Sequence, residues 1–281
     1  MLNKGSYGID FIDEEPPDVD GDAIDYQEHC IGTHKLQSLD GVYSLAHGIL
    51  MVETSGRKTL YPRQACALES AVRRSGLPVT LVMMTSELDL SDNTTCQLIM
   101  SSVTSNISIF TVHPDTLALN TPLQVFFSSD QLIKSPHKMV HTSDSLRMLL
   151  MYKYGGLYLD LDYIILNDLS HYNNFLCEEV NLHLLKTLVM VWLPSLSDTV
   201  DKLFGSMITN SAFSFPRQHP LIKMILENIV KSYSDPEHWS IIGPELITHC
   251  TRNFTETENI LKINPETTGI NIIRYQEEQN L

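Results

Sequence analysis

Two aspartates stand two residues apart in the segment SDSLRMLLMYKYGGLYLDLDYIILN, which runs from Ser143 to Asn167. In a strand, side chains at positions i and i+2 point to the same face, so we expect Asp160 and Asp162 to lie side by side. Two neighbouring carboxylates repel each other unless solvent, a basic partner or a bound cation compensates them. Paired oxygen ligands suit hard divalent ions such as Mg²⁺ or Mn²⁺, whose open positions often hold a phosphate.

The residues before this pair predict a helix that ends at the Gly155-Gly156 pair, because a residue with positive φ after a helix is usually glycine. We expect Thr142 or Ser143 to cap its beginning. Asp144 and Arg147 are three residues apart on this helix and therefore neighbours on one face. The sequence thus places an acid and a base on the element that leads into the paired aspartates.

The chain further upstream alternates between apolar strands and an amphipathic helix. Strands are predicted at 48–52, 77–84 and 106–112, and a helix begins at Pro62 and stops at Gly76. Strand, helix and strand with short connections indicate an α/β fold with a mostly parallel central sheet flanked by helices. Catalytic groups of such sheets lie beyond the carboxyl ends of the strands.

The chain downstream of the aspartates gives weaker signals. We expect a buried helix within the apolar stretch 182–196, a strand at 208–215 and an amphipathic helix at 219–232. A glycine-proline turn at Gly243 then leads into another helix.

Composition narrows the classes of function. The 281 residues are 43% hydrophobic and 19% charged, as in a folded globular protein, and the formal net charge is −15. Such a charge argues against a nucleic-acid partner, because phosphate backbones select basic surfaces. Five cysteines without a Cys-x-x-Cys pair argue against a structural zinc site. Three sequons, at Asn93, Asn106 and Asn253, are compatible with a glycoprotein of the secretory pathway.

The first 45 residues contain an acidic, proline-containing run, DFIDEEPPDVDGDAID. We expect residues 1–45 to be a flexible acidic leader or the remnant of a stem, and residues 46–281 to form the folded domain. No stretch of the chain reads as a signal peptide or a membrane span.

The segment around the aspartates resembles the signature of the α-1,4-glycosyltransferases, which is a Ser-Asp-x-x-Arg helix followed by Tyr/Phe-Gly-Gly-x-Tyr-x-Asp-x-Asp. Further matches follow the order of the family over about residues 48–255. They are ETSGR from Glu53, Thr121-Pro-Leu, Asn210-x-Ala-Phe and Gly243-Pro-Glu-Leu-Ile-Thr.

The resemblance implies a GT-A type nucleotide-sugar-binding fold and transfer of a sugar from a UDP-sugar with retention of the α configuration. It implies that Asp162 ligates Mn²⁺ at the donor diphosphate and that Asp160 contacts ribose, sugar or metal. A cation there would neutralise the charge that builds on the leaving UDP. The resemblance also implies further donor-binding residues, namely Glu53, Thr54, Asp144, Arg147, Asn210 and Gly243.

The resemblance also implies a cellular setting and a substrate class. The expected reaction moves galactose or an N-acetylhexosamine in α-1,4 linkage to a galactose-type acceptor on a glycolipid. The expected location is the lumenal side of the Golgi membrane, with membrane association only through an N-terminal anchor that this sequence lacks. The family continues to a His-x-Trp-Asn segment that is absent here, so we expect a catalytic domain that is incomplete at its C-terminus. Asn210-Ser-Ala also replaces the Asn-Gly-Ala of the family.

Two alternatives stay open. A catalytically inactive, glycosyltransferase-like protein would bind metal and nucleotide without turnover. A phosphatase of the haloacid dehalogenase type also uses Asp-x-Asp at the end of a strand, but it requires Thr or Val where this chain has Ile164. Its motif also lies near the start of the domain, whereas about 160 residues precede the motif here.

Overall fold

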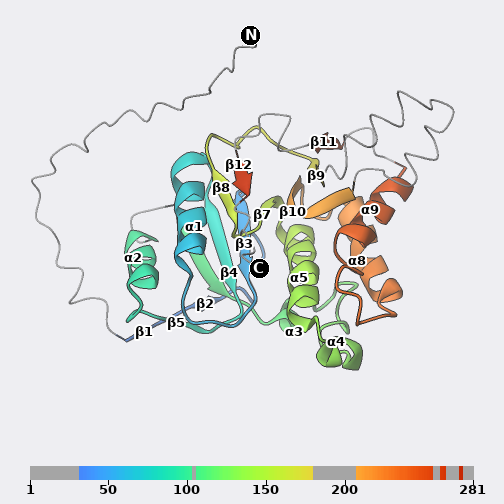
Figure 1. Ribbon diagram of the computed structural model, residues 1–281, viewed down its shortest axis with the longest axis horizontal. Helices are drawn as coiled ribbons and strands as arrows, with labels where there is room; N and C mark the ends of the chain where they lie inside the picture. Colours follow the sequence, from blue (N-terminus) through green and yellow to red (C-terminus); the bar gives the residue numbers. More distant parts are fainter. Residues whose placement is uncertain (1–31, 103–105, 180–206, 256–259, 264–271, 275–281) are drawn as a thin grey trace, which may run out of the picture.

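The computed structural model describes residues 32–102, 106–179, 207–255, 260–263 and 272–274 (Figure 1). Its centre is an eight-stranded sheet in the order β11-β9-β10-β7-β3-β4-β6-β2. The strands of this sheet are β2 (Gln37–Ser38), β3 (Ile49–Glu53), β4 (Val79–Met83), β6 (Ile107–Thr111), β7 (Gly156–Leu159), β9 (Phe175–Glu179), β10 (Met207–Phe215) and β11 (Leu261–Ile263).

Two small sheets flank the central one. In the first, β1 (Thr33–Lys35) pairs with β5 (Glu87–Asp89), and in the second β8 (Tyr163–Ile165) pairs with β12 (Ile272–Arg274). The helices are α1 (Pro62–Arg74), α2 (Asn93–Ser102), α3 (Pro114–Leu117), α4 (Asp130–Lys134), α5 (Lys138–Tyr154), α8 (Pro220–Ser232) and α9 (Pro244–Asn253).

The central sheet is mixed and mostly parallel, as the alternation of strands and helices predicts. β2, β6, β4, β3 and β7 pair in parallel, so their carboxyl ends meet at one edge. β10 runs antiparallel between β7 and β9. The prediction of an α/β fold with a mostly parallel sheet is therefore confirmed.

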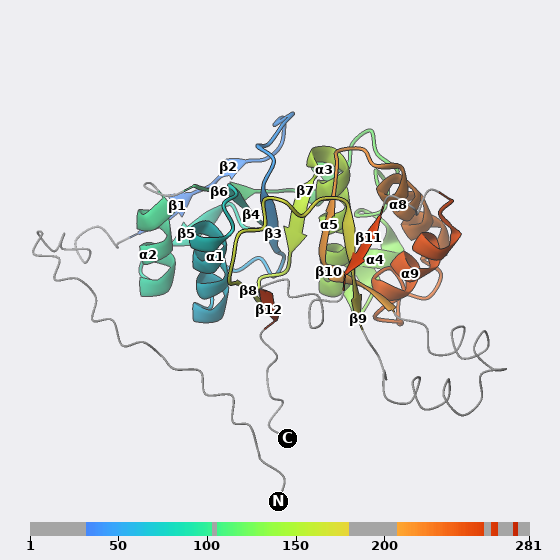
Figure 2. The same ribbon diagram turned by 90° about the horizontal axis from the view of Figure 1, so that it is seen from above.

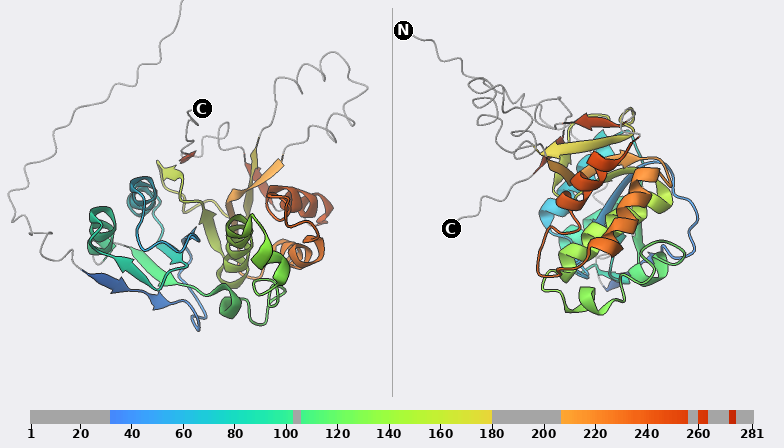
Figure 3. Two further views of the ribbon diagram at one scale, coloured as in Figure 1. Left: turned by 60° about the horizontal axis from the view of Figure 1, so that its bottom comes forward. Right: turned by 90° about the vertical axis from the view of Figure 1, so that its right-hand side faces the viewer.

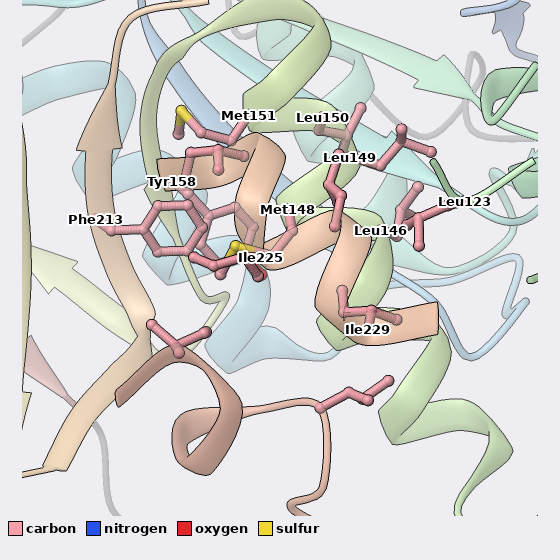
Figure 4. Packing of buried hydrophobic residues seen from close by; sticks show 14 of the residues in the cluster. Leu123, Leu146, Met148, Leu149, Leu150, Met151, Tyr158, Phe213, Ile225 and Ile229 are labelled. Atoms are coloured by element: carbon pink, nitrogen blue, oxygen red, sulfur yellow. The ribbon is translucent and has the colours of Figure 1, made fainter. Parts of the chain in front are cut away.

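Helices cover both faces of this sheet (Figures 2 and 3). α1 packs over one face, where Ile49, Met51 and Leu157 belong to a first hydrophobic cluster. α5 and α9 pack over the other face, and α8 packs against both of them. There Tyr158 and Phe213 of the sheet meet Leu146, Met148, Leu149, Leu150 and Met151 of α5 and Ile225 and Ile229 of α8 (Figure 4). The alternating strand residues thus point into two separate cores.

α5 is the central helix, and it begins earlier than the sequence predicts. Its N-cap is His137, so Thr142 and Ser143 lie inside the helix and neither caps it. Buried contacts of the early turns, above all those of His141, hold this additional turn in place, and tertiary packing overrides the local capping preference. The predicted end is confirmed, because Gly155 is the C-cap with a φ of 69°.

Ordered structure also begins earlier than the expected domain boundary. β1 and β2 lie within the stretch for which a flexible leader is predicted, and β2 joins the edge of the central sheet beside β6. β1 and β2 form because their backbone groups find hydrogen-bond partners in β5 and β6, and the composition of residues 33–38 does not predict these partners. Residues 1–31 and the apolar stretch 182–196 lie outside the described residues. None of the described helices has the length and apolar character that a membrane span requires.

Candidate active site

The paired aspartates lie in a turn and not on a strand face. β7 ends at Leu159, and Asp160, Leu161 and Asp162 connect it to β8, which belongs to another sheet. The backbone N–H of Asp160 still donates to the carbonyl of Ser211 in β10, at 2.9 Å. The expectation that the two side chains share one strand face is therefore wrong, because the chain must leave the central sheet there to reach the partner of β8. Both carboxylates nevertheless remain at the carboxyl edge of the parallel strands, half-buried.

Arg147 of α5 joins this turn to the helix. Its Nη1 lies 3.1 Å from Oδ1 of Asp160 and donates to the carbonyl oxygen of Asn210 at 2.9 Å. Its Nη2 lies 3.3 Å from Oδ1 of Asp144 and donates to the hydroxyl of Ser143 at 2.9 Å. The predicted neighbourhood of Asp144 and Arg147 is confirmed, but the guanidinium also reaches across to Asp160.

Asn210 and Gly243 close the same cluster from β10 and the start of α9. Nδ2 of Asn210 donates to Oδ1 of Asp144 at 2.7 Å, in a buried environment. A Cβ added to Gly243 would lie 2.8 Å from Oδ2 of Asp144 and 3.5 Å from Nδ2 of Asn210. The backbone therefore approaches these side chains so closely that only glycine fits without a shift.

Asn210 reaches Asp144 from an irregular part of β10. The register between β10 and β9 shifts between Thr209 and Phe213, and Asn210 lies within the shifted stretch. Such irregularities of a strand commonly re-aim a side chain next to a functional site. The side chain that Ser211 adds, relative to the Asn-Gly-Ala of the family, is buried and bonded to the hydroxyls of Tyr163 (2.8 Å) and Thr209 (2.6 Å).

Tyr158 is a member of the cluster that the sequence reasoning does not single out as a site residue. Its hydroxyl donates to Oδ1 of Asp160 at 2.6 Å, and its ring lies 5.1 Å from the Arg147 guanidinium and stacks on Phe213. The available signal is its i−2 position relative to Asp160, which places it at the same side of the chain.

Burial and charge act together on the ionisable groups of this cluster. Burial alone would lower the pKa of Arg147, but the charge of Asp160, followed by Tyr158, Asp144 and Asp162, raises it, so the guanidinium stays protonated. Burial raises the pKa of Asp144, against the opposing effects of Arg147 and Asn210. Burial also raises the pKa of Tyr158 well above its ordinary value. One cation thus faces three carboxyl groups in a site that largely excludes water.

Glu53 and Thr54 lie at the same edge of the sheet but apart from this cluster. Glu53 ends β3, which neighbours β7, and its Oε1 accepts a hydrogen bond from the backbone of Ser55 at 3.1 Å. Its Oε2 is buried and has no hydrogen-bond partner among the described residues. In the part of the chain that the structure describes, no hydrogen bond or ion pair joins Glu53 or Thr54 to Arg147 and its partners.

The donor set suits a divalent cation that a substrate helps to hold. Across the described ranges, no group of three or more His, Cys, Asp or Glu side chains gathers as a complete metal site. Mg²⁺ is typically bound through one or two carboxylates together with substrate phosphates and water, and Mn²⁺ accepts the same oxygen ligands. Asp160 and Asp162 are such a pair, and the excess of carboxylates over Arg147 favours an added positive charge.

Comparisons with known proteins point to one family. Residues 66–181 match the model described as glycosyltransferase sugar-binding region containing DXD motif. Residues 214–279 match the α-1,4-glycosyltransferase conserved region. The two matches enclose Asp144, Arg147, Asp160, Asp162 and Gly243.

Curated relatives and a solved structure agree with these matches. The chain is 25% identical over 239 residues to the α-1,4-N-acetylglucosaminyltransferase of Homo sapiens, which covers 83% of this chain and 63% of the relative. It is 26% identical over 220 residues to the lactosylceramide 4-α-galactosyltransferase of Mus musculus, which covers 76% of this chain and 53% of the relative. The chain thus spans between half and two thirds of the length of these relatives. The PaToxG glycosyltransferase superposes with a TM-score of 0.50 at 13% identity, over 83% of this chain and 76% of that chain, which supports a GT-A-like fold.

Proposed function

This chain belongs to the α-1,4-glycosyltransferase family, and from that premise we propose that it moves a hexose from a UDP-sugar to a galactose-type acceptor on a glycolipid. The observation that carries the proposal is the contact between Arg147 and Asp160. It unites the Ser-Asp-x-x-Arg helix with the Asp-x-Asp turn, and Asn210 and Gly243 complete the same cluster. Four segments that the resemblance marks as donor-binding therefore meet at one edge of the sheet.

We infer a positioning role for Arg147, whereas the resemblance suggests that it binds the donor sugar and phosphate directly. Its five N–H groups all face protein acceptors, namely the carbonyl and hydroxyl of Ser143, the carbonyl of Asn210, Asp144 and Asp160. A guanidinium has five donors and no more. Arg147 therefore orients Asp144 and Asp160 for the donor and leaves the diphosphate to other groups.

We assign the two aspartates of the turn to different parts of the donor. Asp162 would hold Mn²⁺, with Asp160 beside it, and the ion when bound supplies positive charge to the departing diphosphate. Tyr158 and Arg147 hold the carboxylate of Asp160, and in this proposal that carboxylate would contact the ribose or the sugar. Asp144 and Asn210 would contact the transferred sugar, and Glu53 and Thr54 the nucleoside at the end of β3.

The identity of the sugar and the setting follow the family. The names of the two relatives contain different transferred groups, N-acetylglucosamine and galactose, so both are donors to test. The acceptor in the second name is lactosylceramide, a glycolipid. By this resemblance we place the protein at the lumenal side of the Golgi membrane.

The first experiment is calorimetric titration of the chain with UDP-galactose and UDP-N-acetylglucosamine, each with and without Mn²⁺. We expect binding of one donor in the range of about 1 µM to 1 mM, dependent on Mn²⁺. Asp162→Asn should weaken this binding at least about tenfold, since the ion would lose a carboxylate ligand. Asp130→Asn, an exposed aspartate paired with Lys134 on α4, is the matched control and should bind like the wild type.

Turnover separates the enzyme from its alternative. Release of UDP that accelerates when lactosylceramide is added would support transfer. Donor binding without such release would support the inactive, glycosyltransferase-like protein. A folded protein that binds neither donor would contradict the donor site itself.

A further inference from the structure

A buried histidine lies one helical turn before Asp144 on α5. His141 has no exposed surface, and both nitrogens of its ring have polar neighbours. Nδ1 lies 2.7 Å from the hydroxyl of Tyr233 and 3.3 Å from that of Ser135. Nε2 lies 3.2 Å from each of two backbone carbonyl oxygens, those of His238 and Trp239.

These neighbours define the hydrogen-bonding pattern of the ring. Carbonyl oxygens only accept, so Nε2 carries the hydrogen and donates, and Nδ1 is free to accept from the hydroxyl of Tyr233. Burial lowers the pKa of His141, against the two carbonyls and Asp144. A neutral imidazole therefore matches the hydroxyl of Tyr233 on one side and the two loop carbonyls on the other.

Apart from Ser135, the partners of His141 lie in one loop, which we call the 233–243 loop, from Tyr233 at the end of α8 to Gly243 at the start of α9. Ser135, just before α5, binds the same loop, since its hydroxyl donates to the carbonyl of Pro236 at 2.7 Å. Three backbone carbonyls of the loop, those of Pro236, His238 and Trp239, thus accept hydrogen bonds from α5 and the segment before it.

The far end of the 233–243 loop is the part that touches the candidate donor site. Gly243 approaches Asp144 and Asn210 so closely that an added Cβ would lie 2.8 Å from Oδ2 of Asp144. His141 and Asp144 are three residues apart on the same helix and hence on the same side of it. The same side of α5 therefore contacts the loop twice, through His141 at the carbonyls of His238 and Trp239 and through Asp144 at Gly243.

We propose that His141 is a positioning residue, which holds the 233–243 loop so that Gly243 forms a fixed wall beside Asp144 and Asn210, on the sugar side of the site. The proposal rests on the proposed function for its account of what the wall contacts. On this proposal His141 affects the alignment of the transferred sugar. It does not affect binding of the cation and diphosphate, which would be held at the Asp160–Asp162 turn.

Two substitutions of His141 test the contributions of its two ring nitrogens separately. His141→Gln can place an amide N–H near the position of Nε2 and so keep a donor for the loop carbonyls. His141→Asn keeps a polar atom near Nδ1 but is too short to reach these carbonyls. Tyr233→Phe removes only the hydroxyl that Nδ1 accepts from, and serves as the control for the other side of the ring.

The kinetic arm compares UDP with UDP-sugar. We expect all three variants to bind UDP with Mn²⁺ within about twofold of the wild type, which matches an unperturbed phosphate site. In His141→Asn, kcat for UDP release from the active UDP-sugar should fall about tenfold or more, because a small misplacement of reacting groups costs rate. His141→Gln should recover most of that loss, and Tyr233→Phe should lose little.

A second arm does not depend on turnover. Trp239 is 60% exposed, and its own carbonyl accepts from His141, so its indole reports on the loop. In a Trp192→Phe background Trp239 is the single tryptophan. We expect acrylamide quenching and loss of fluorescence anisotropy to increase in His141→Asn and to stay near the wild-type level in His141→Gln.

The outcomes decide between positioning and other roles. Normal kcat and normal quenching in His141→Asn would overturn the proposal, as would equal losses of UDP binding and turnover in both His141 variants, which would indicate a general defect of the fold. If the wild type binds no UDP-sugar, the proposed function fails, and the fluorescence arm still supports or overturns the hold of His141 on the loop.

Discussion

The two ends of the central parallel strands are built in opposite ways. At the carboxyl end, Arg147 is buried between Asp144 and Asp160, and the charged groups bind one another. At the amino end of β7, a cavity of about 390 Å³ opens beside Lys153 and Arg217 and extends to the segments around Asp40 and Leu117.

The cations at the amino end have different partners. Lys153 donates to the carbonyl of Leu117, and Arg217 donates to that of Tyr43 at 3.1 Å. Each of these cations caps a backbone group beside open space and so fastens a loop. At the carboxyl end the opposed charges are buried together, whereas Lys153 is half-buried and Arg217 is exposed. This fold therefore places its preorganised polar groups at the carboxyl end.

Removing the arginine at each end is the strongest test of this difference between the two ends. Arg147→Met leaves two carboxylates without their buried partner, so we expect a loss of about 3–5 kcal/mol in the free energy of unfolding. Arg217→Met removes one exposed hydrogen bond and should cost within about 0.5 kcal/mol. Urea denaturation of the two variants measures both values. Similar losses would mean that the carboxyl end is no more tightly organised than the amino end.

A second pair adds one methyl group at each end. Gly155→Ala places a Cβ 2.5 Å from the backbone nitrogen of Arg217 at a positive φ, so we expect about 2–4 kcal/mol of destabilisation. Gly243 has a φ of −91°, outside the left-handed region, and the Cβ that Gly243→Ala adds meets only side-chain atoms.

The methyl at Gly243 should therefore affect binding more than stability. We expect about 1 kcal/mol of destabilisation and a tenfold weaker affinity for the active UDP-sugar, because Asp144 must move. Thermal unfolding and calorimetry give the two numbers. A Gly243→Ala variant with unchanged affinity would remove this glycine from the donor site.

A third pair removes one tyrosine hydroxyl at each end. Tyr158→Phe removes a hydrogen bond to the charged Asp160 and should cost about 1.5–3 kcal/mol at pH 7. Tyr154→Phe removes a bond to the carbonyl of Val42 and should cost about 1 kcal/mol.

Alkali sharpens the tyrosine comparison. Burial raises the pKa of Tyr158 well above 10 in the folded chain, while the unfolded chain ionises near 10. The folded state then binds more protons than the unfolded state, so wild-type stability falls as the pH rises above 10. Phenylalanine does not ionise, so the stability of Tyr158→Phe lacks this dependence on pH. The difference in unfolding free energy between the wild type and Tyr158→Phe should therefore shrink between pH 9 and 11, by at most about 1.4 kcal/mol per pH unit, as measured by urea denaturation. A deficit that grows with pH would contradict this assignment.

Much of the fold follows from local pattern. The strands β3, β4, β6 and β10, the helices α1, α8 and α9 and the stop at Gly155 all agree with the sequence analysis, because apolar periodicity and glycine or proline signals act over a few residues. Of the site, the Asp144–Arg147 neighbourhood follows from helical spacing alone.

What the sequence does not predict depends on contacts between distant segments. The turn at Asp160 exists because β8 pairs with β12, over a hundred residues further along the chain. The aim of Asn210 depends on a register shift against β9, and the early start of α5 on the bonds of His141 to the 233–243 loop. None of these partners lies within the reach of a local pattern.

The position of the candidate site on α5 has a consequence for its dynamics. Ten of the seventeen residues of α5 are buried, from His141 to Met151, and sheet and helices enclose them. Amides in such an element exchange with solvent mainly through opening of the whole domain. We therefore expect the amides of Asp144 and Arg147 to exchange slowly even without a donor, so hydrogen–deuterium exchange should show little added protection there when a donor binds.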